Sequence, residues 1–412
     1  MSEDRTQTTL ASYSPAEPLL LFTDFAPDFA GGGAVILRSL LPKDHRRSLL
    51  WVSPSPGSAR ASGRVAELSV GKVDHTGRRS TLLDMTVFAR SLSRELLAQA
   101  AAARAQAVWV VLHGSGVPVA AELMRQNRLP VHITVHDDPT FGVALRSRRY
   151  LLLVPWLEHC VARALAGARS VDVISEGMRR RYVDRYGVQS FVVHRAVSGP
   201  IAPSQQFDAA RGLRVGVLGN TYAYAQLPVL AKAIALAART LAIPGTLAFI
   251  GRGLAARLRR EIKPSSELAI EEHGHLEEAD AIPLLREQFL LYLNYPFGWR
   301  HAVLRQTSFP TKLSTYVLAS RPLLVHAPED STIAGLGSKW ACALSWTSMS
   351  AEEGAETLIA AWRDPRMHES VHEFAERIRV QYFDPERNQR ALATALNTLV
   401  HPIVKQGTGS AS

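Results

Sequence analysis

The chain has few cysteines and no long apolar run. Only Cys160 and Cys342 occur among its 412 residues, which excludes a disulfide scaffold and a cysteine-rich metal site. Two unpaired thiols are typical of a reducing compartment. The longest apolar runs, such as Tyr150–Trp156, fall far short of the roughly 20 residues that a bilayer-spanning helix needs. A membrane-spanning protein is therefore also excluded.

Acidic residues are too few to balance the basic ones. Lys and Arg number 47 against 37 Asp and Glu, which gives a net charge of +10 and a pI near 9.8. Such an excess suits nucleic acid, an anionic membrane or phosphate-bearing ligands. Aromatic residues make up only 7% and do not interleave with basic ones, so we expect no nucleic-acid partner. The 47% hydrophobic content indicates a globular protein.

Apolar strands alternate with helical patterns along most of the chain, which indicates a parallel α/β architecture. Two such series follow one another, and the proline-containing segment Ser198–Arg211 separates them as a linker. The polar N-terminus contains no apolar signal core, so we expect a cytoplasmic protein. The predicted parts are a disordered lead over 1–17, Rossmann-like domains over 18–200 and 201–370, C-terminal helices over 371–400 and a disordered tail over 401–412.

His136 and Asp137 follow an apolar strand predicted over Val131–Val135. Because the carboxyl ends of parallel strands line the ligand crevice of such folds, these two residues are candidate catalytic residues. A histidine there can bind a hydroxyl or titrate near neutrality. The alternative is a histidine that only caps a helix. No acidic cluster beyond Asp137–Asp138 suggests a metal, so we expect none.

Three glycine-containing turns follow other predicted strands. Gly32 and Gly33 precede a helical stretch, where the backbone can approach an anion closely. Asn220 and Arg252 each follow a strand and adjoin a glycine, so they are candidate phosphate or base contacts. Plain turns are the alternative. The Gly-Arg-Gly sequence at Arg252 is too short for a dinucleotide fingerprint, which disfavours an NAD-dependent enzyme.

The segment Phe309–Leu313 is the strongest candidate anion site in the sequence. Pro310 can stand at or just before the start of a helix. Backbone N–H groups around Thr311 and the charge of Lys312 would then face the crevice, as a diphosphate requires. A capped helix with an exposed lysine is the alternative.

The consecutive arginines Arg179, Arg180 and Arg181 have two interpretations that the sequence leaves open. They follow Ser175, a plausible N-cap, and so lie in the first turns of a predicted helix. They form either a solvated helix face or a patch for anionic lipid headgroups.

Six segments, in this order along nearly the whole chain, resemble the GT-B glycosyltransferases. The resemblance is to the retaining, family-four-like group of bacterial surface-sugar transferases in particular. The segments are GGGAVILRSL at Gly31–Leu40, ITVHDDP at Ile133–Pro139, VDVISEGMRRRYVDRYG at Val171–Gly187, LRVGVLGN at Leu213–Asn220, FIGRG at Phe249–Gly253 and FPTKLSTYVLASRPLLVHAP at Phe309–Pro328.

The resemblance implies two Rossmann-like domains facing across a cleft, with a C-terminal helix that crosses back to the first domain. It implies transfer of a sugar from a nucleotide-sugar to a glycan or lipid-linked acceptor, without metal or cofactor and with retention of configuration. In such relatives the glycine loop lies beside the donor phosphates, and the histidine matching His136 contacts the transferred sugar. A cytoplasmic protein that binds the anionic inner face of the membrane is the implied location.

The chain departs from this family at positions that bind the donor. Two glutamates of the family correspond to Thr307 and Thr315, and an arginine and a lysine correspond to Asn220 and Gln226. Threonine can still bind ribose but lacks the carboxylate charge. A catalytically degenerate GT-B binding protein is therefore the alternative function. The expected donor-binding residues are Gly32, Gly33, Asn220, Arg252, Arg305, Pro310, Thr311, Lys312 and Thr315, with Arg300 as a further cation near the crevice.

Overall fold

The chain forms two compact units, each with its own sheet. The computed structural model describes residues 18–25, 32–41, 49–53, 64–67, 82–140, 148–219, 223–251, 258–337 and 340–400. Unit 1 comprises Met1–Ala196 with Pro385–Ser412, and unit 2 comprises Val197–Asp384. The first crossing thus lies four residues before the expected boundary at 200. The return to unit 1 lies at Pro385, so residues 371–384, expected among the crossing helices, belong to unit 2.

Unit 1 contains a seven-stranded sheet in the order β3-β2-β1-β4-β5-β6-β7, in which every pair is parallel. The central strands are buried along their whole length, as expected when helices cover both faces. Because the order reverses at the neighbours β1 and β4, a crevice is expected at their carboxyl ends. The strands are β1 (Leu19–Phe22), β2 (Leu49–Ser53), β3 (Arg64–Glu67), β4 (Ala107–Val111), β5 (Val131–Val135), β6 (Ser170–Val173) and β7 (Phe191–Val192).

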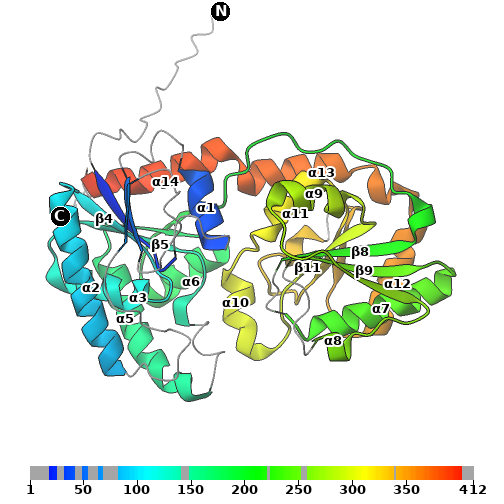
Figure 1. The fold of residues 1–412 in the computed structure, drawn as a ribbon, viewed down its shortest axis with the longest axis horizontal. Coiled ribbons are helices and arrows are strands. Elements are labelled where there is room, and N and C mark those ends of the chain that lie inside the picture. The colour runs from blue at the N-terminus through cyan, green and yellow to red at the C-terminus, as the bar shows by residue number, and fades with distance from the viewer. Residues whose placement is uncertain are drawn as a thin grey trace, which may run out of the picture. The chain divides into compact units, whose positions relative to one another are not determined.

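Helices cover both faces of the unit 1 sheet (Figure 1). On one face α2, α3 and α5 pack together, and on the other α14 packs against β5, β6 and α1. Among the described helices none is both long and apolar enough to cross a membrane. The helices are α1 (Gly32–Leu40), α2 (Leu82–Ala102), α3 (Gly116–Gln126), α5 (Val154–Gly167), α6 (Glu176–Tyr186) and α14 (Pro385–Val400), with a 3-10 helix over Arg148–Leu153.

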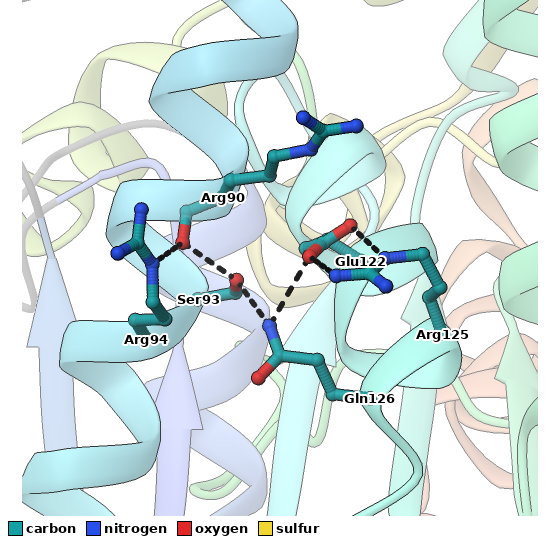
Figure 2. A network of polar contacts seen from close by, with 6 residues as sticks. All are labelled: Arg90, Ser93, Arg94, Glu122, Arg125 and Gln126. Carbon is teal, nitrogen blue, oxygen red and sulfur yellow. Dashed lines mark hydrogen bonds and ion pairs between the residues drawn. The ribbon is translucent and has the colours of Figure 1, made fainter.

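A polar network on the outer side joins α2 to α3 (Figure 2). The Gln126 amide donates to Ser93 Oγ on α2 at 2.9 Å and to Glu122 Oε1 on its own helix at 3.3 Å. Arg125 donates twice to Glu122, at 2.7 and 2.9 Å, and this pairing holds the pKa of Glu122 below its usual range. Because Arg125 is exposed, its pairing with Glu122 adds little stability. The hydrogen bond from Gln126 to Ser93 is the contact of this network that links the two helices.

Unit 2 contains a six-stranded parallel sheet in the order β10-β9-β8-β11-β12-β13. Its order reverses between β8 and β11, so the expected crevice lies at the carboxyl ends of these two strands. The strands are β8 (Leu213–Leu218), β9 (Gly245–Ile250), β10 (Leu268–Glu272), β11 (Leu290–Asn294), β12 (Leu323–His326) and β13 (Ala343–Trp346).

Helices also cover both faces of the unit 2 sheet (Figure 1). On one face α7 packs against α12, and on the other α11 packs against α9 and α13. The apolar stripe of α13 is buried, which is why this helix stays in unit 2. The helices are α7 (Gln226–Leu241), α8 (Leu258–Glu261), α9 (Glu278–Arg286), α10 (Ala302–Thr307), α11 (Lys312–Ala319), α12 (Ala351–Arg363) and α13 (Val371–Ile378).

The two crossings of the chain between the units are tied to each other by hydrogen bonds. On the unit 2 side, the Val197 N–H donates to the Phe383 carbonyl at 2.9 Å. On the unit 1 side, the His194 N–H donates to Asn388 Oδ1 at 2.8 Å, and Asn388 is buried. The two segments that join the units therefore run side by side.

Candidate functional site

In unit 1, polar residues that follow β1 and β4 meet at the point where the strand order reverses. The Ser115 hydroxyl donates to Asp24 Oδ1 at 2.5 Å, and His113 Nδ1 lies 3.7 Å from Asp24 Oδ2. The Asp24 carboxylate is only 13% exposed, whereas the His113 side chain is 60% exposed. Nothing in the sequence singled out Asp24, because a single acid after a strand matches no motif.

The turn after β4 is built around this carboxylate. Gly114 has φ +51°, and a Cβ on it would lie 2.1 Å from Asp24 Oδ2. Only glycine avoids both the backbone strain and the clash. The sequence thus permits a close approach of the turn to Asp24.

His136 and Gly33, both expected at the site, lie next to each other. A Cβ on Gly33 would come within 3.3 Å of His136 Nδ1 and 3.1 Å of Phe25 Cζ. Burial lowers the pKa of His136 to about 4, although the charge of Asp172 opposes this shift. The imidazole is therefore neutral at pH 7, with one nitrogen donating and the other accepting. Asp137 follows it and is half-buried; its catalytic role stays a prediction.

The three consecutive arginines on α6 have different surroundings. Ser175 caps this helix as predicted, because its side chain accepts from the Met178 N–H at 3.0 Å. Arg179 pairs at 2.7 Å with Glu176, three residues earlier on the same helix, and Arg180 is exposed. Arg181 is partly buried, and its Nε lies 3.8 Å from Asp138.

In unit 2, α11 is fixed across the point where that sheet reverses its order. The Tyr316 hydroxyl accepts from the Leu218 N–H of β8 and donates to the Tyr292 carbonyl of β11, both at 2.9 Å. The helix begins at Lys312, directly after Pro310 and Thr311, as the sequence predicted. Its N-terminus therefore lies at the carboxyl edge of the sheet, where a ligand is expected.

Lys312 carries the clearest chemical signal in unit 2. Its Nζ is buried and has no hydrogen-bond partner in the part of the chain that the structure describes. Burial lowers the pKa of Lys312 to about 8. The alternative of an exposed lysine is therefore wrong. A buried ammonium group beside the positive end of a helix dipole favours an anionic ligand.

The two threonines at the family's glutamate positions are both engaged with the protein. Thr307 is fully buried, and its hydroxyl donates to the Val303 carbonyl at 2.6 Å. The Thr315 hydroxyl donates to Glu278 Oε1 at 2.5 Å. A carboxylate from the start of α9 thus lies beside Thr315. Sequence reasoning missed Glu278, because this contact joins residues 37 positions apart.

Arg305, expected to bind the donor, is held by the protein instead. It forms two hydrogen bonds to Asp330, at 2.6 and 2.8 Å, and one to the Gly298 carbonyl at 2.9 Å. Little of its guanidinium is left to bind a diphosphate. Arg300 stacks over the exposed Trp299 ring at 5.3 Å.

Of the remaining expected residues, Asn220 and Arg252 lie outside the described residues. The described residues just before them, Gly219 and Gly251, lie close together, because a Cβ on Gly251 would lie 3.0 Å from Gly219 Cα. Gly32 is the first residue of α1 and is exposed. The donor-binding roles of these residues stay predictions.

Comparison with known proteins identifies the fold. No protein-family model matches the chain, and no curated protein matches it. Solved structures do match over 92–94% of this chain and nearly all of their own length, at 12–14% sequence identity.

Three of these structures illustrate the match. HepE of Anabaena, in complex with UDP and glucose, has a TM-score of 0.64 at 14% identity, with 93% of this chain and 100% of that chain covered. Sucrose-phosphate synthase of Thermosynechococcus elongatus has a TM-score of 0.67 at 12% identity, with 93% and 99% covered. The trehalose-6-phosphate synthase OtsA has a TM-score of 0.63 at 13% identity, with 94% and 100% covered. These are GT-B glycosyltransferases, and the chain has the GT-B fold, as the sequence predicted.

Proposed function

We propose that the protein is a glycosyltransferase that moves a sugar from a nucleotide-sugar donor to a surface polysaccharide or glycolipid acceptor. The observation that carries this proposal is the Nζ of Lys312 at the N-terminus of α11, which is buried and has no hydrogen-bond partner among the described residues. The structural neighbours include a protein bound to UDP-glucose and one bound to UDP-2-fluoro glucose. A nucleoside diphosphate is the anion that this arrangement in this fold favours.

In the proposed reaction, unit 2 stabilises the leaving group. Negative charge develops on the diphosphate as the bond to the sugar breaks, and Lys312 with the α11 N-terminus offsets it. Glu278, held by Thr315, supplies a carboxylate that can accept hydrogen bonds from ribose hydroxyls. It would take over the role of the carboxylate that Thr315 lacks. We further propose that transfer needs no metal and retains the anomeric configuration.

Unit 1 supplies the groups proposed to bind the acceptor and the transferred sugar. Neutral His136 can donate a hydrogen bond to a sugar hydroxyl through one ring nitrogen and accept one through the other. Asp24 and His113 add a carboxylate acceptor and a second imidazole after β1 and β4. Sugars are commonly bound through such mixed donors and acceptors.

The test is incubation with a panel of nucleotide-sugars and lipid-linked or glycan acceptors, with and without a chelator. We expect release of the nucleoside diphosphate with one donor, unchanged by chelation, and a product whose anomeric configuration is read by NMR. Calorimetric binding of the same nucleotide without turnover would support the degenerate binding protein, which the burial of Thr307 favours. Neither binding nor turnover with any nucleotide would end both proposals.

We also propose that unit 1 binds an anionic membrane surface through the 3-10 helix Arg148–Leu153. This helix begins with two arginines and ends with three leucines, of which Leu151 is 52% and Leu152 is 83% exposed. In the sequence the exposed leucines closely follow two arginines, and apolar residues combined with cations suit an interface with acidic lipid headgroups. We propose that the exposed Arg180 also contributes positive charge to this membrane-binding surface. Arg181 is not included in the proposed surface, because its Nε lies 3.8 Å from Asp138.

Replacing both Leu151 and Leu152 by glutamine should weaken binding to vesicles that contain phosphatidylglycerol by about ten-fold or more, because two apolar side chains no longer leave water. Co-sedimentation measures this. Replacing Val380, which is 59% exposed on unit 2, by glutamine is the matched control and should change nothing. Equal binding of the double variant and the native chain, or no preference for anionic over neutral vesicles, would contradict the proposal.

A further inference from the structure

A buried cation that pairs with no carboxylate of the described chain lies at the amino-terminal edge of the unit 2 sheet. Arg321 stands between α11 and β12 and is 2% exposed. Its Nε donates to the Gln288 carbonyl at 2.7 Å and its Nη1 to the Gln205 carbonyl at 2.8 Å. Its Nη2 is buried and has no partner, and no carboxylate of the described residues pairs with Arg321.

A histidine with two unused ring nitrogens packs against the same phenylalanine as this cation. His368 Nδ1 and Nε2 are both buried and lack hydrogen-bond partners among the residues that the structure describes. Its ring stacks on Phe207, with 6.1 Å between centroids and 9° between planes, and Arg321 Cζ lies 5.4 Å from the same Phe207 ring. Burial and the charge of Arg321 together lower the pKa of His368 to about 4.

A third basic residue and an exposed segment complete the cluster. Arg286 of α9 donates to the Pro203 carbonyl at 3.1 Å and to Gln205 Oε1 at 3.3 Å, so it contacts the residue that Arg321 also contacts. Ser204 donates to the His368 carbonyl at 3.1 Å. The exposed segment 203–205 is therefore held by hydrogen bonds to all three basic residues.

The arrangement offers positive charge and hydrogen-bond donors, and among the described residues no acid pairs with Arg321. A buried charge without a counter-ion is costly, and buried polar atoms nearly always have partners. Arg321 Nη2 offers two N–H groups, and the neutral imidazole of His368 offers one more. A ligand that uses these donors must be small, anionic and rich in acceptor oxygens.

We propose that Arg321, His368 and Arg286 form a binding site for a phosphate-type oxyanion, either free phosphate or the phosphoryl group of a small metabolite. The site is separate from the proposed donor site, because Lys312 and Arg321 lie at opposite ends of α11, about 13 Å apart along its axis. The sequence contains no motif for this site; its residues come from three separated segments. It does not depend on the proposed transferase activity.

The site is tested with inorganic phosphate as the probe, at constant ionic strength against chloride. We expect phosphate to raise the unfolding temperature in a saturable way. The same stabilisation should persist in a Lys312→Met variant, in which phosphate can no longer bind beside Lys312 at the proposed donor site. In the Lys312→Met background, Arg286→Gln and His368→Asn should each weaken phosphate binding by about ten-fold, because each removes one hydrogen bond to a charged group. Arg321→Met should abolish binding; if it fails to fold, the other two variants still decide.

A second set of ligands distinguishes the sources of the phosphoryl group. Tighter binding of glucose 6-phosphate than of inorganic phosphate assigns the site to a phosphorylated metabolite, and the reverse order assigns it to free phosphate. The proposal is overturned if phosphate gives no stabilisation beyond that of chloride. It is equally overturned if Arg286→Gln and His368→Asn bind phosphate as the Lys312→Met parent does.

Discussion

Replacing Lys312 by methionine should reduce kcat/KM for the nucleotide-sugar by about 10²–10³-fold, which is typical of removing one group that stabilises a transition-state charge. The same change should stabilise the protein at neutral pH by about 1–3 kcal/mol, because it removes a charge whose burial lowers its pKa. Lost activity with a raised unfolding temperature is a signature that a merely structural lysine does not give.

The pH dependence of this stabilisation follows from the two pKa values of Lys312. The folded value is about 8 and the ordinary value is 10.5, so below pH 8 both states carry the proton and the full cost of burial is present. Between these values the unfolded state binds more protons, so the stability of the native chain rises with pH. The advantage of Lys312→Met should therefore shrink over this range and vanish above it.

Lys232→Met on α7 is the matched control. Lys232 is exposed and pairs with Glu352 at 2.7 Å, so its replacement should leave both activity and stability nearly unchanged. Thermal unfolding from pH 6 to 10.5 and steady-state kinetics measure the two effects. A Lys312→Met variant with native kcat/KM would contradict the assigned role, and so would one that is less stable than the native chain at pH 7.

Replacing Asp172 by alanine should destabilise unit 1 by about 3–5 kcal/mol, the cost of breaking a buried polar pair from one side. Asp172 on β6 accepts from His132 at 2.6 Å and from the Thr134 hydroxyl, and His132 is fully buried. His132 also contacts Ser170 at 2.8 Å, so the whole network lies between β5 and β6. Without the carboxylate, two buried groups lose their partner.

Hydrogen exchange gives the local measurement, because a single unfolding energy is poorly defined for a chain with two units. Amides of β5 and β6 should exchange about 10²–10³-fold faster, while those of the unit 2 sheet serve as an internal reference. Glu158→Ala is the matched control: Glu158 pairs with Arg185 on the surface of unit 1, so it should cost less than about 1 kcal/mol. Unchanged exchange in β5 would show that this network does not stabilise the sheet.

The alternation of buried strands with amphipathic helices made the fold predictable. Strands such as Ala107–Val111 are buried on both faces, so their apolar runs stand out in the sequence. The start of α11 was equally clear, because Pro310 marks it locally. C-terminal helices over 371–400 were predicted as well, but the sequence could not indicate which unit the helix before Pro385 joins. An apolar stripe predicts that one face of a helix is buried, but not which unit it packs against.

Side-chain pairing across the fold was not predictable. Arg305 was expected to bind a ligand, but its partner Asp330 lies 25 positions further along the chain. Glu278 and Asp24 were missed because the first contacts Thr315 and the second contacts Ser115, both from other elements. Local sequence patterns indicate periodicity and turns. They do not indicate which charged side chains from distant parts of the chain form contacts.

The late return of the chain to unit 1 has a consequence for biosynthesis. Unit 2 is one continuous stretch, Val197–Asp384, whereas unit 1 needs α14, which is made after all of unit 2. A nascent chain that has not yet released Pro385–Val400 exposes the faces of β5 and β6 that α14 covers. Synthesis of unit 1 thus begins before that of unit 2 but ends after it. Unit 1 therefore stays incomplete during synthesis until all of unit 2 has been made.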